Sequence, residues 1–459
     1  MTISSPGPGG GSIPTAEGAV APRAARAGGR RWMLAAAALT LLSFSLHLGL
    51  GAHFRGLGVC DEWNVLFDAD PNVYLTSFAG GGLIGPWGGR SFVHPNLSNF
   101  VHPPLVLLAR SIERLHLSRR EPRELRRDLA MGVAPLFAAL RVPVLLALFR
   151  LLGFPLGWGV LFCLLDLVSF SGLLFGSLPE SYGPTGTLLA VTYLLVADAI
   201  RPGGRIRHAA WLATGVVVTG ITISNLLPFA LIYGLTVRFQ PRAPRGASAM
   251  AGAAVSTALM TAAVAALTFG IYRLGGYAAG SALPFSPHAT PHVFEAWDPD
   301  LLKAVRDFPL ALANTFAPGL PGQVPKDFPG DLHSFTLTFA PTGRALTGFD
   351  LRSIAILAAL AVGMAGHLRA PHAQRAMTWA IAGVMAFSWL FYSLYGRELF
   401  LYSQHWQVPA LLMLAGIGHL RHRFPRAVVA GTVLLGLLIA AQSALQLGRI
   451  TRLLATPGS

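Results

Sequence analysis

Long runs of hydrophobic residues alternate with short polar segments along the whole chain. The runs are about 18 to 25 residues long, which is the length that an α-helix needs to cross about 30 Å of hydrocarbon. They show neither the strict alternation of a half-buried strand nor the roughly 3.5-residue repeat of a coiled coil. The pattern therefore predicts an all-α fold, a polytopic transmembrane helical bundle.

We expect about 11 spans, with the amino terminus in the cytoplasm and the carboxyl terminus outside. The stretch 209–237 has basic segments at both ends, and Ser224, Asn225 and Pro228 interrupt it. Because a single crossing would violate the positive-inside rule, we predict a hairpin of two short or partly re-entrant helices there. The other expected spans are residues 32–51, 129–152, 155–174, 182–199, 247–274, 351–368, 377–394, 406–420 and 427–447.

The spans divide the chain into a cytoplasmic tail, a transmembrane core, an external loop with short helices, and a set of C-terminal transmembrane helices. The tail is rich in Gly, Pro, Ser and Ala and lacks the apolar core of a signal peptide, so we expect it to be disordered. The core contains a long first external loop, residues 52–128, in which the apolar but charge-interrupted stretch 104–117 is expected to lie in the membrane interface. The four parts span residues 1–31, 32–275, 276–350 and 351–459.

Composition supports a membrane protein, because 53% of the residues are hydrophobic and only 12% are charged, against about 25% charged in soluble domains. The net charge of +15 could indicate a nucleic-acid partner. The arginines, however, sit in short segments between apolar runs, which is typical of cytoplasmic loops. We therefore expect no nucleic-acid partner and a multi-pass protein of a bacterial inner membrane, in contact with its lipids.

The basic run from Arg119 to Arg127 is an exception, since it falls on the expected external side. Either it meets acidic lipid headgroups, or the predicted topology is wrong at this point.

Two other groups of polar residues bear on chemistry inside and outside the membrane. Arg141 and Asp166 fall within expected spans, where an unpaired charge is costly, so we expect them to pair across neighbouring helices; the alternative is a transport pathway. Cys60 and Cys163 are expected to lie apart without a disulfide, and their spacing fits no metal site. Pro291 and the prolines around the segment 288–298 prevent a helical His-x-x-x-His metal site among its histidines and acids.

The residues that could carry catalysis begin directly after the first span. The motifs are, in order, Cys60-Asp61-Glu62-Trp63, His94-Pro95-Asn96 and His102-Pro103-Pro104-Leu105. A carboxylate at the outer mouth of a helix bundle is placed to deprotonate an acceptor hydroxyl or amine, or to hold a cation, beside a lipid-borne donor. The alternative is that Asp61 and Glu62 are ordinary solvated loop residues.

The order of these motifs resembles the membrane glycosyltransferases of the GT-C superfamily, and most closely their protein mannosyltransferase and aminoarabinose transferase branch. There, an Asp-Glu pair near the outer end of the first span is followed by a Lys/His-Pro-Pro-Leu element, as Asp61-Glu62 is followed here, roughly 40 residues on, by His102 to Leu105. Later pieces resemble the branch in the same order. They are Pro179-Glu180, the broken hairpin Gly220 to Pro228 with Ser-Asn in place of the frequent Thr-Lys, and Gly396 to Tyr402 followed by Pro409.

The resemblance implies a transferase that takes a sugar from a polyprenyl-phosphate carrier at the outer face of the membrane, within the cell envelope. The acceptor would be a lipid, a glycan or a protein. By the same resemblance Asp61 would be the general base, Glu62 and Glu180 would orient acceptor or sugar, and His102 would lie near the phosphate. A divalent metal is possible as a cofactor, because the family includes both metal-using and metal-free members, and the oligomeric state stays open.

Three later residues are candidates for binding the substrate. Arg397 could stabilise charge on the leaving phosphate, because arginine binds phosphate with two parallel hydrogen bonds. The alternative for Arg397 is a snorkelling side chain paired with Glu398. Tyr402 and His405 lie beside it in the sequence, although a histidine near a helix end also suits an interface anchor.

Two other classes of function stay open. A transporter or lipid flippase would be expected to show paired internal repeats and charges inside several spans, whereas the chain has no repeat and few such charges. A relative without catalytic activity, which scaffolds envelope assembly, would fit the same hydrophobic pattern.

Overall fold

The computed structural model describes most of the chain as helices. The described residues are 21–62, 64–67, 69–80, 93–241, 246–278, 303–325, 332–339, 350–369, 374–394, 399–422 and 425–455. The segment 288–298 and the residues Trp63, Arg397 and Glu398 lie outside them.

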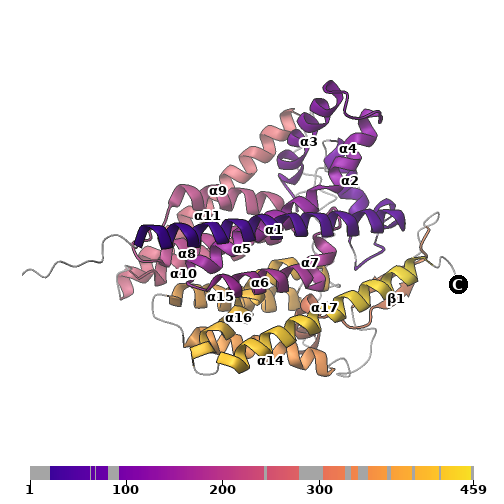
Figure 1. Cartoon of the computed structure of the whole chain (residues 1–459). Coiled ribbons are helices and arrows are strands. Elements are labelled where there is room, and N and C mark those ends of the chain that lie inside the picture. The colour runs from indigo at the N-terminus through magenta and orange to yellow at the C-terminus, as the bar shows by residue number, and fades with distance from the viewer. Residues whose placement is uncertain are drawn as a thin grey trace, which may run out of the picture.

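The longer helices follow the hydrophobic runs (Figure 1). They are α1 Ala21–Gly56, α5 Val133–Leu151, α6 Leu156–Val168, α8 Tyr182–Ile200, α9 His208–Ile221, α10 Leu226–Phe239, α11 Ala247–Ala278, α14 Leu351–Leu368, α15 Arg375–Leu394, α16 Ser403–Ala415 and α17 Pro425–Ala455. Among the described residues, seven helices are long and apolar enough to cross a membrane, and three shorter ones are apolar. A multi-pass helical membrane protein is therefore confirmed, while the count of about 11 spans stays a prediction.

Shorter elements connect these helices. They are the turns η1 Val59–Asp61, η2 Ile223–Asn225, η3 Lys303–Asp307, η5 Leu399–Tyr402 and η6 Gly416–His422, the helices α2 Pro71–Gly80, α3 Leu97–Arg114, α4 Pro122–Met131, α7 Phe170–Phe175 and α13 Phe308–Phe316, and the antiparallel strands β1 Gly322–Pro325 and β2 Phe335–Thr338. The sequence predicted short helices in the segment 276–350, and α13 is one, but it did not predict the two strands.

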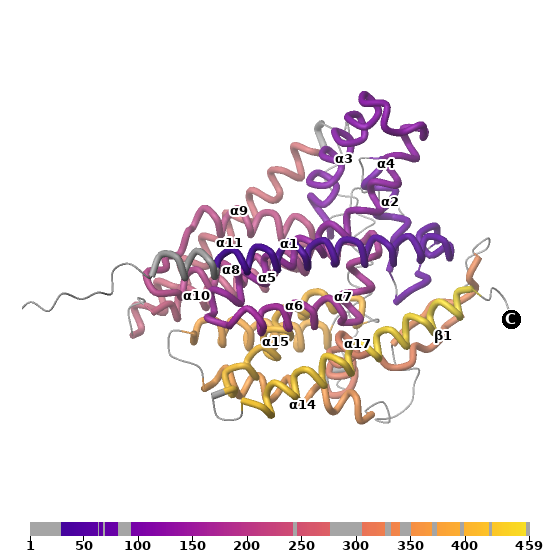
Figure 2. The backbone as a smooth tube through the Cα atoms, viewed as in Figure 1, coloured from indigo at the N-terminus to yellow at the C-terminus, as the bar shows by residue number. Residues whose placement is uncertain are grey.

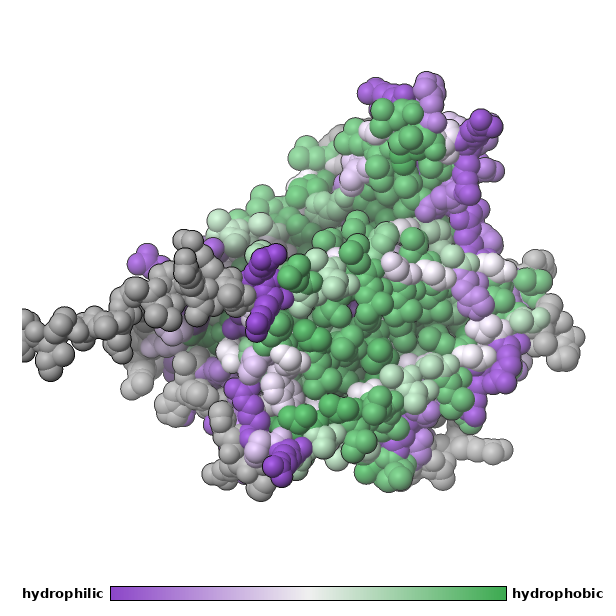
Figure 3. Space-filling model, viewed as in Figure 1, coloured by the Kyte–Doolittle hydropathy of each residue, from purple (hydrophilic) through white to green (hydrophobic). Residues whose placement is uncertain are grey.

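Hydrophobic and hydrophilic side chains are separated along the length of the helices. A band of hydrophobic residues covers the middle of the molecule, and hydrophilic residues gather toward both ends of the helices (Figure 3). The helices α2, α3 and α4 gather at the end of the bundle where α1 terminates, away from the amino-terminal end of α1 (Figure 2). This is the arrangement expected of a bundle that crosses a lipid bilayer along the helix direction.

The predicted broken hairpin is confirmed. The helices α9 and α10 are antiparallel, because the His208 Nδ1 at the start of α9 lies 3.0 Å from the Tyr233 hydroxyl in the second half of α10. Between them η2 interrupts the helix, and the Asn225 side-chain amide there donates to the Val218 carbonyl oxygen at 3.1 Å. The start of α9 and the end of α10 therefore lie at the same end of the bundle.

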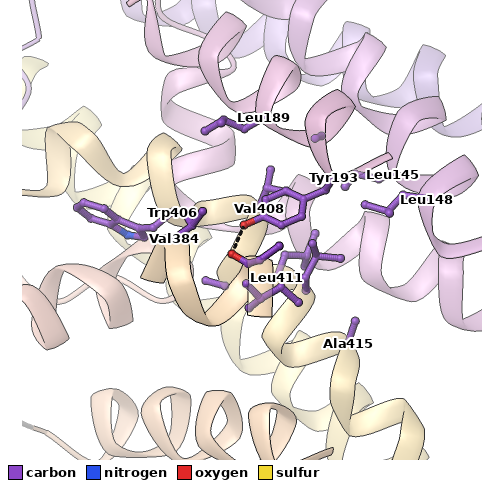
Figure 4. Packing of buried hydrophobic residues seen from close by; sticks show 14 of the residues in the cluster. Leu145, Leu148, Leu189, Tyr193, Val384, Trp406, Val408, Leu411 and Ala415 are labelled. Carbon is purple, nitrogen blue, oxygen red and sulfur yellow. Dashed lines mark hydrogen bonds between the residues drawn. The ribbon is translucent and has the colours of Figure 1, made fainter. Parts of the chain in front are cut away.

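The helix α16 lies at the centre of the bundle. Its residues from Ser403 to Leu412 are all buried, and Trp406, Val408 and Leu411 pack with side chains of α5, α8 and α15 (Figure 4). Glycines let the backbone of α14 approach it closely, since a Cβ at Gly363 would collide with the backbone at Met413. The chain thus positions α16 by contacts on all sides.

A buried ion pair joins α5 and α6, as the sequence predicted. The Arg141 Nε lies 2.9 Å from an Asp166 carboxylate oxygen, and both side chains are at most 5% exposed. Two glutamine side chains of α16 bond to this ion pair. The Arg141 guanidinium donates to the Gln404 side-chain oxygen at 2.7 Å, and the Gln407 side-chain amide donates to the Asp166 carboxylate at 2.7 Å. Each charge therefore has both an opposite charge and a hydrogen bond, as burial in lipid requires.

Candidate functional site

A group of buried and half-buried polar side chains lies where the chain enters α8. We call it the Glu180 cluster, and its members come from α2, the segment 93–96, the turn before α8, η5 and α16. They are Tyr74, His94, Glu180, Tyr402 and His405. The structure thus brings together three of the residues that the sequence singled out, Glu180, Tyr402 and His405, from segments that are far apart in the chain.

Glu180 is held by backbone donors. It is 1% exposed, and its Oε1 accepts a 2.6 Å bond from the Asp70 backbone N–H while its Oε2 accepts a 3.2 Å bond from the Ser181 N–H. Backbone N–H donors favour the charged form of a carboxylate and fix its orientation. These two backbone donors fix the orientation of the carboxylate.

Tyr74 and His94 form a hydrogen-bonded pair beside Glu180. The Tyr74 hydroxyl lies 2.8 Å from the His94 Nε2, and the His94 Nδ1 lies 2.9 Å from the Ile221 carbonyl oxygen. Because only a protonated Nδ1 can donate to that carbonyl, Nε2 is the accepting nitrogen. Burial lowers the pKa of His94 to about 4, and burial, with the Glu180 charge added, raises the pKa of Tyr74 well above 10. Both groups are therefore uncharged at neutral pH.

His405 is the member of the cluster whose polar atoms are unsatisfied. Its side chain is 2% exposed, and in the described part of the chain neither ring nitrogen has a hydrogen-bond partner. Its ring lies among tyrosines, with ring centroids 5.8 Å from Tyr392, 6.1 Å from Tyr182 and 6.3 Å from Tyr402. A buried polar group without a partner costs free energy, so a water or a bound molecule is expected to satisfy it.

Tyr182 connects the two halves of the cluster. It lies within electrostatic range of Glu180, Tyr74 and Tyr402, and His405 is close enough to His94 for the charge of one ring to act on the other. A carboxylate, phenol hydroxyls and an imidazole collected in a site that excludes bulk water can bind the hydroxyl groups of a polar ligand and accept a proton from one of them.

The adjacent acids Asp61 and Glu62 point to different places. Asp61 is about half exposed and pairs with Arg127 of α4. Burial and the neighbouring Asp61 carboxylate raise the pKa of Cys60 to about 12, so this thiol is not a nucleophile at neutral pH. Cys60 and Cys163 are both free, as predicted.

Glu62 joins three distant segments. Its carboxylate accepts bonds from the backbone N–H of Leu332 at 2.7 Å and of His333 at 3.2 Å, and the His333 Nδ1 lies 3.1 Å from it. The other ring nitrogen of His333 lies 3.2 Å from the carbonyl oxygen of Leu454 in α17. Glu62 thus ties the first loop to the segment before β2 and to the last helix, and its predicted catalytic role stays a prediction.

The remaining predicted residues lie apart from the Glu180 cluster or outside the described residues. His102 is half-buried on α3, and its Nδ1 lies 2.9 Å from the Phe78 carbonyl oxygen of α2. Arg397 lies outside the described residues. Asp61 connects to the cluster through its own loop, because the Asn72 amide donates to the Asp61 carbonyl at 3.1 Å and Asp70, two residues earlier, donates to Glu180.

Sequence reasoning missed Tyr74 and the pairing of Asp61 with Arg127. Tyr74 sits in a short apolar stretch that carries no motif, and its partners become neighbours only when α2 folds against the turn before α8. Within the described residues, no three His, Cys, Asp or Glu side chains gather in a way that could hold a metal ion. A metal-dependent mechanism therefore stays a prediction that comes from the resemblance.

The helices and the buried cluster define a multi-pass membrane protein with a polar, carboxylate-containing site at one end of its bundle. No known family model matches this chain, and a search of curated proteins found no match either.

Proposed function

We propose that the chain is a glycosyltransferase that moves a sugar from a polyprenyl-phosphate carrier to a lipid, glycan or protein acceptor at the outer face of a bacterial inner membrane. The observation that carries this proposal is His405, a buried imidazole with both nitrogens unsatisfied among the described residues, in a cluster where Tyr182 lies near both its ring and the oriented carboxylate of Glu180. Sugar hydroxyls are the kind of group that such side chains bind, and tyrosine rings suit the apolar faces of a sugar.

The proposed roles follow from position. Glu180 orients the sugar or the acceptor, with Tyr74 and His94 holding the neighbouring hydrogen bonds. His405 and Tyr402 bind the sugar or its phosphate. Asp61, half exposed at the bundle end, is the proposed general base, and its ion pair with Arg127 holds its carboxylate in place.

The test uses His405→Phe, which keeps a ring of similar shape and removes both nitrogens. Because these nitrogens bond to nothing in the described protein, the variant should be as stable as the wild type while losing sugar transfer by about 100-fold or more. His367→Phe is the matched control. It removes another buried imidazole, whose Nε2 lies 2.6 Å from the Leu412 carbonyl oxygen, so it should lower stability and spare transfer in the protein that is folded.

Transfer is measured with purified protein in liposomes, using a panel of radiolabelled polyprenyl-phosphate sugars and following the label into lipid, glycan and protein fractions. Undiminished transfer by well-folded His405→Phe would refute the role of His405. Undiminished transfer by Asp61→Asn would remove the general base. If the wild type transfers no sugar from any donor and does not bind polyprenyl phosphate, the proposed function is wrong.

A further inference from the structure

A basic hollow lies between α2 and α4, apart from the Glu180 cluster. Its volume is about 280 Å³, and one wall is formed by Leu75, Thr76 and Ala79 of α2. The other wall carries three arginines of α4, Arg123, Arg126 and Arg127, with Glu124 beside them. Arg127 pairs with Asp61. Within the described residues Arg123 and Arg126 make no ion pair, and the Arg126 Nε is buried without a hydrogen-bond partner.

These arginines lie at the end of the bundle opposite to the amino-terminal arginines. Arg55 at the end of α1 pairs with Asp128 of α4 at 2.5 Å, whereas Arg30 and Arg31 lie at the other end of the same long helix. The two basic groups therefore lie at opposite ends of the bundle, so at most one of them can follow the positive-inside rule. If the amino terminus is cytoplasmic, as the sequence predicts, the positive charge of the basic run calls for an anionic partner on the other side.

The neighbouring helix α3 has exposed leucines. It packs with both α2 and α4, and it leaves Leu107, Leu108 and Leu115 largely exposed. An amphipathic helix with exposed leucines and flanking arginines is typical of the membrane interface, as the sequence predicted for 104–117. The hollow thus lies beside an exposed apolar surface that suits acyl chains.

We propose that the hollow between α2 and α4 binds the phosphodiester headgroup of an acidic phospholipid, with Arg123 and Arg126 as its ligands. Its volume falls below the range of about 300 to 1,000 Å³ that encloses whole drug-sized ligands, so it accommodates a headgroup while the acyl chains stay in the bilayer. Arginine binds phosphate oxygens in a planar, two-pronged geometry. A bound lipid would also hold α4, and with it Arg127 beside Asp61, in place.

The test compares two double variants of the full-length protein that lose the same charge. Arg123→Gln/Arg126→Gln removes the proposed ligands and leaves Arg127 intact, whereas Arg30→Gln/Arg31→Gln removes two exposed arginines at the other end of α1. Each protein is titrated in neutral detergent with short-chain phosphatidylglycerol, phosphatidylcholine or inorganic phosphate, and bound ligand is counted by native mass spectrometry. A thermal melt of each variant confirms that it is folded.

Loss of two cations near a lipid phosphate should weaken phosphatidylglycerol binding by about 25-fold, roughly fivefold for each arginine. The Arg30/Arg31 variant should bind phosphatidylglycerol within about twofold of the wild type, and phosphatidylcholine should bind weakly to all. Equal losses in the two double variants would mean diffuse charge attraction and would overturn the site. Displacement of the lipid by inorganic phosphate at similar concentration would assign the hollow to a free anion and overturn the lipid. Both outcomes are independent of any sugar transfer.

Discussion

The ion pair between α5 and α6 leads to a prediction whose size follows from its burial. Asp166→Asn keeps the shape of the side chain and an oxygen that can accept from Gln407, but it removes the charge opposite Arg141. Both side chains of the pair are at most 5% exposed. Breaking a buried pair by removing one partner costs about 3 to 5 kcal/mol, because the other charge stays buried without compensation.

An exposed pair provides the matched control. Asp198 lies 2.8 Å from Arg201, but the Arg201 side chain is 43% exposed, so Asp198→Asn should cost at most about 1 kcal/mol. Replacing both members of the buried pair, in Arg141→Met/Asp166→Leu, should cost less than Asp166→Asn alone, because no charge is left unpaired. Gln404 would still lose its arginine donor in that variant.

The assay is reversible unfolding in mixed micelles, followed by tryptophan fluorescence as the fraction of denaturing detergent rises. If Asp166→Asn costs no more than Asp198→Asn, or if the double variant is less stable than Asp166→Asn, then the pair is not held together by mutual compensation of charge and the reasoning fails.

Two further predictions concern the first loop. Glu62→Ala should destabilise the protein by about 3 kcal/mol, because two backbone N–H groups and the His333 ring lose their acceptor. Glu62→Gln keeps an acceptor oxygen and should cost less. Equal unfolding midpoints for Glu62→Ala and the wild type would contradict this prediction. Folding lowers the pKa of His94 from 6.5 to about 4. The free energy of unfolding is therefore unaffected by this group above pH 6.5, and it decreases as the pH falls from 6.5 toward 4, by about 3 kcal/mol at most. In His94→Asn the stability should depend less on pH over that window, and an unchanged slope would show that His94 does not titrate as described.

Those features that depend on local sequence could be predicted. The helices follow the hydrophobic runs because the cost of leaving backbone groups unpaired in lipid permits little else. The hairpin break at Ile223 to Asn225 is expected from Pro228, which lies in the first turn of α10, and from basic residues at both ends of the stretch. The pairing of Arg141 with Asp166 follows from the cost of a lone charge in the bundle.

The features that depend on tertiary contacts could not be predicted. The sequence does not show that the side chains of Asp61 and Glu62 have different partners. They diverge because η1 ends at Asp61 and the backbone of Glu62 is extended, with φ −118°. Tyr74 and His94 meet only because α2 and the segment 93–96 fold against the turn before α8. The strands β1 and β2 are too short for an alternation to be recognised.

The helix α16 links the ion pair to the candidate site. Gln404 and Gln407 are three residues apart and lie on one face, where they bond to Arg141 and Asp166. His405 follows Gln404 by about 100° of helix rotation and therefore faces the tyrosines of the Glu180 cluster. The rotation of α16 about its axis is thus fixed by the ion pair on one side, and that rotation sets where the His405 nitrogens point. The buried ion pair of Arg141 and Asp166 thereby orients the His405 imidazole. Arg141→Met/Asp166→Leu, which removes both glutamine contacts, should therefore lower the proposed sugar transfer by protein that is still folded, whereas Asp198→Asn should not.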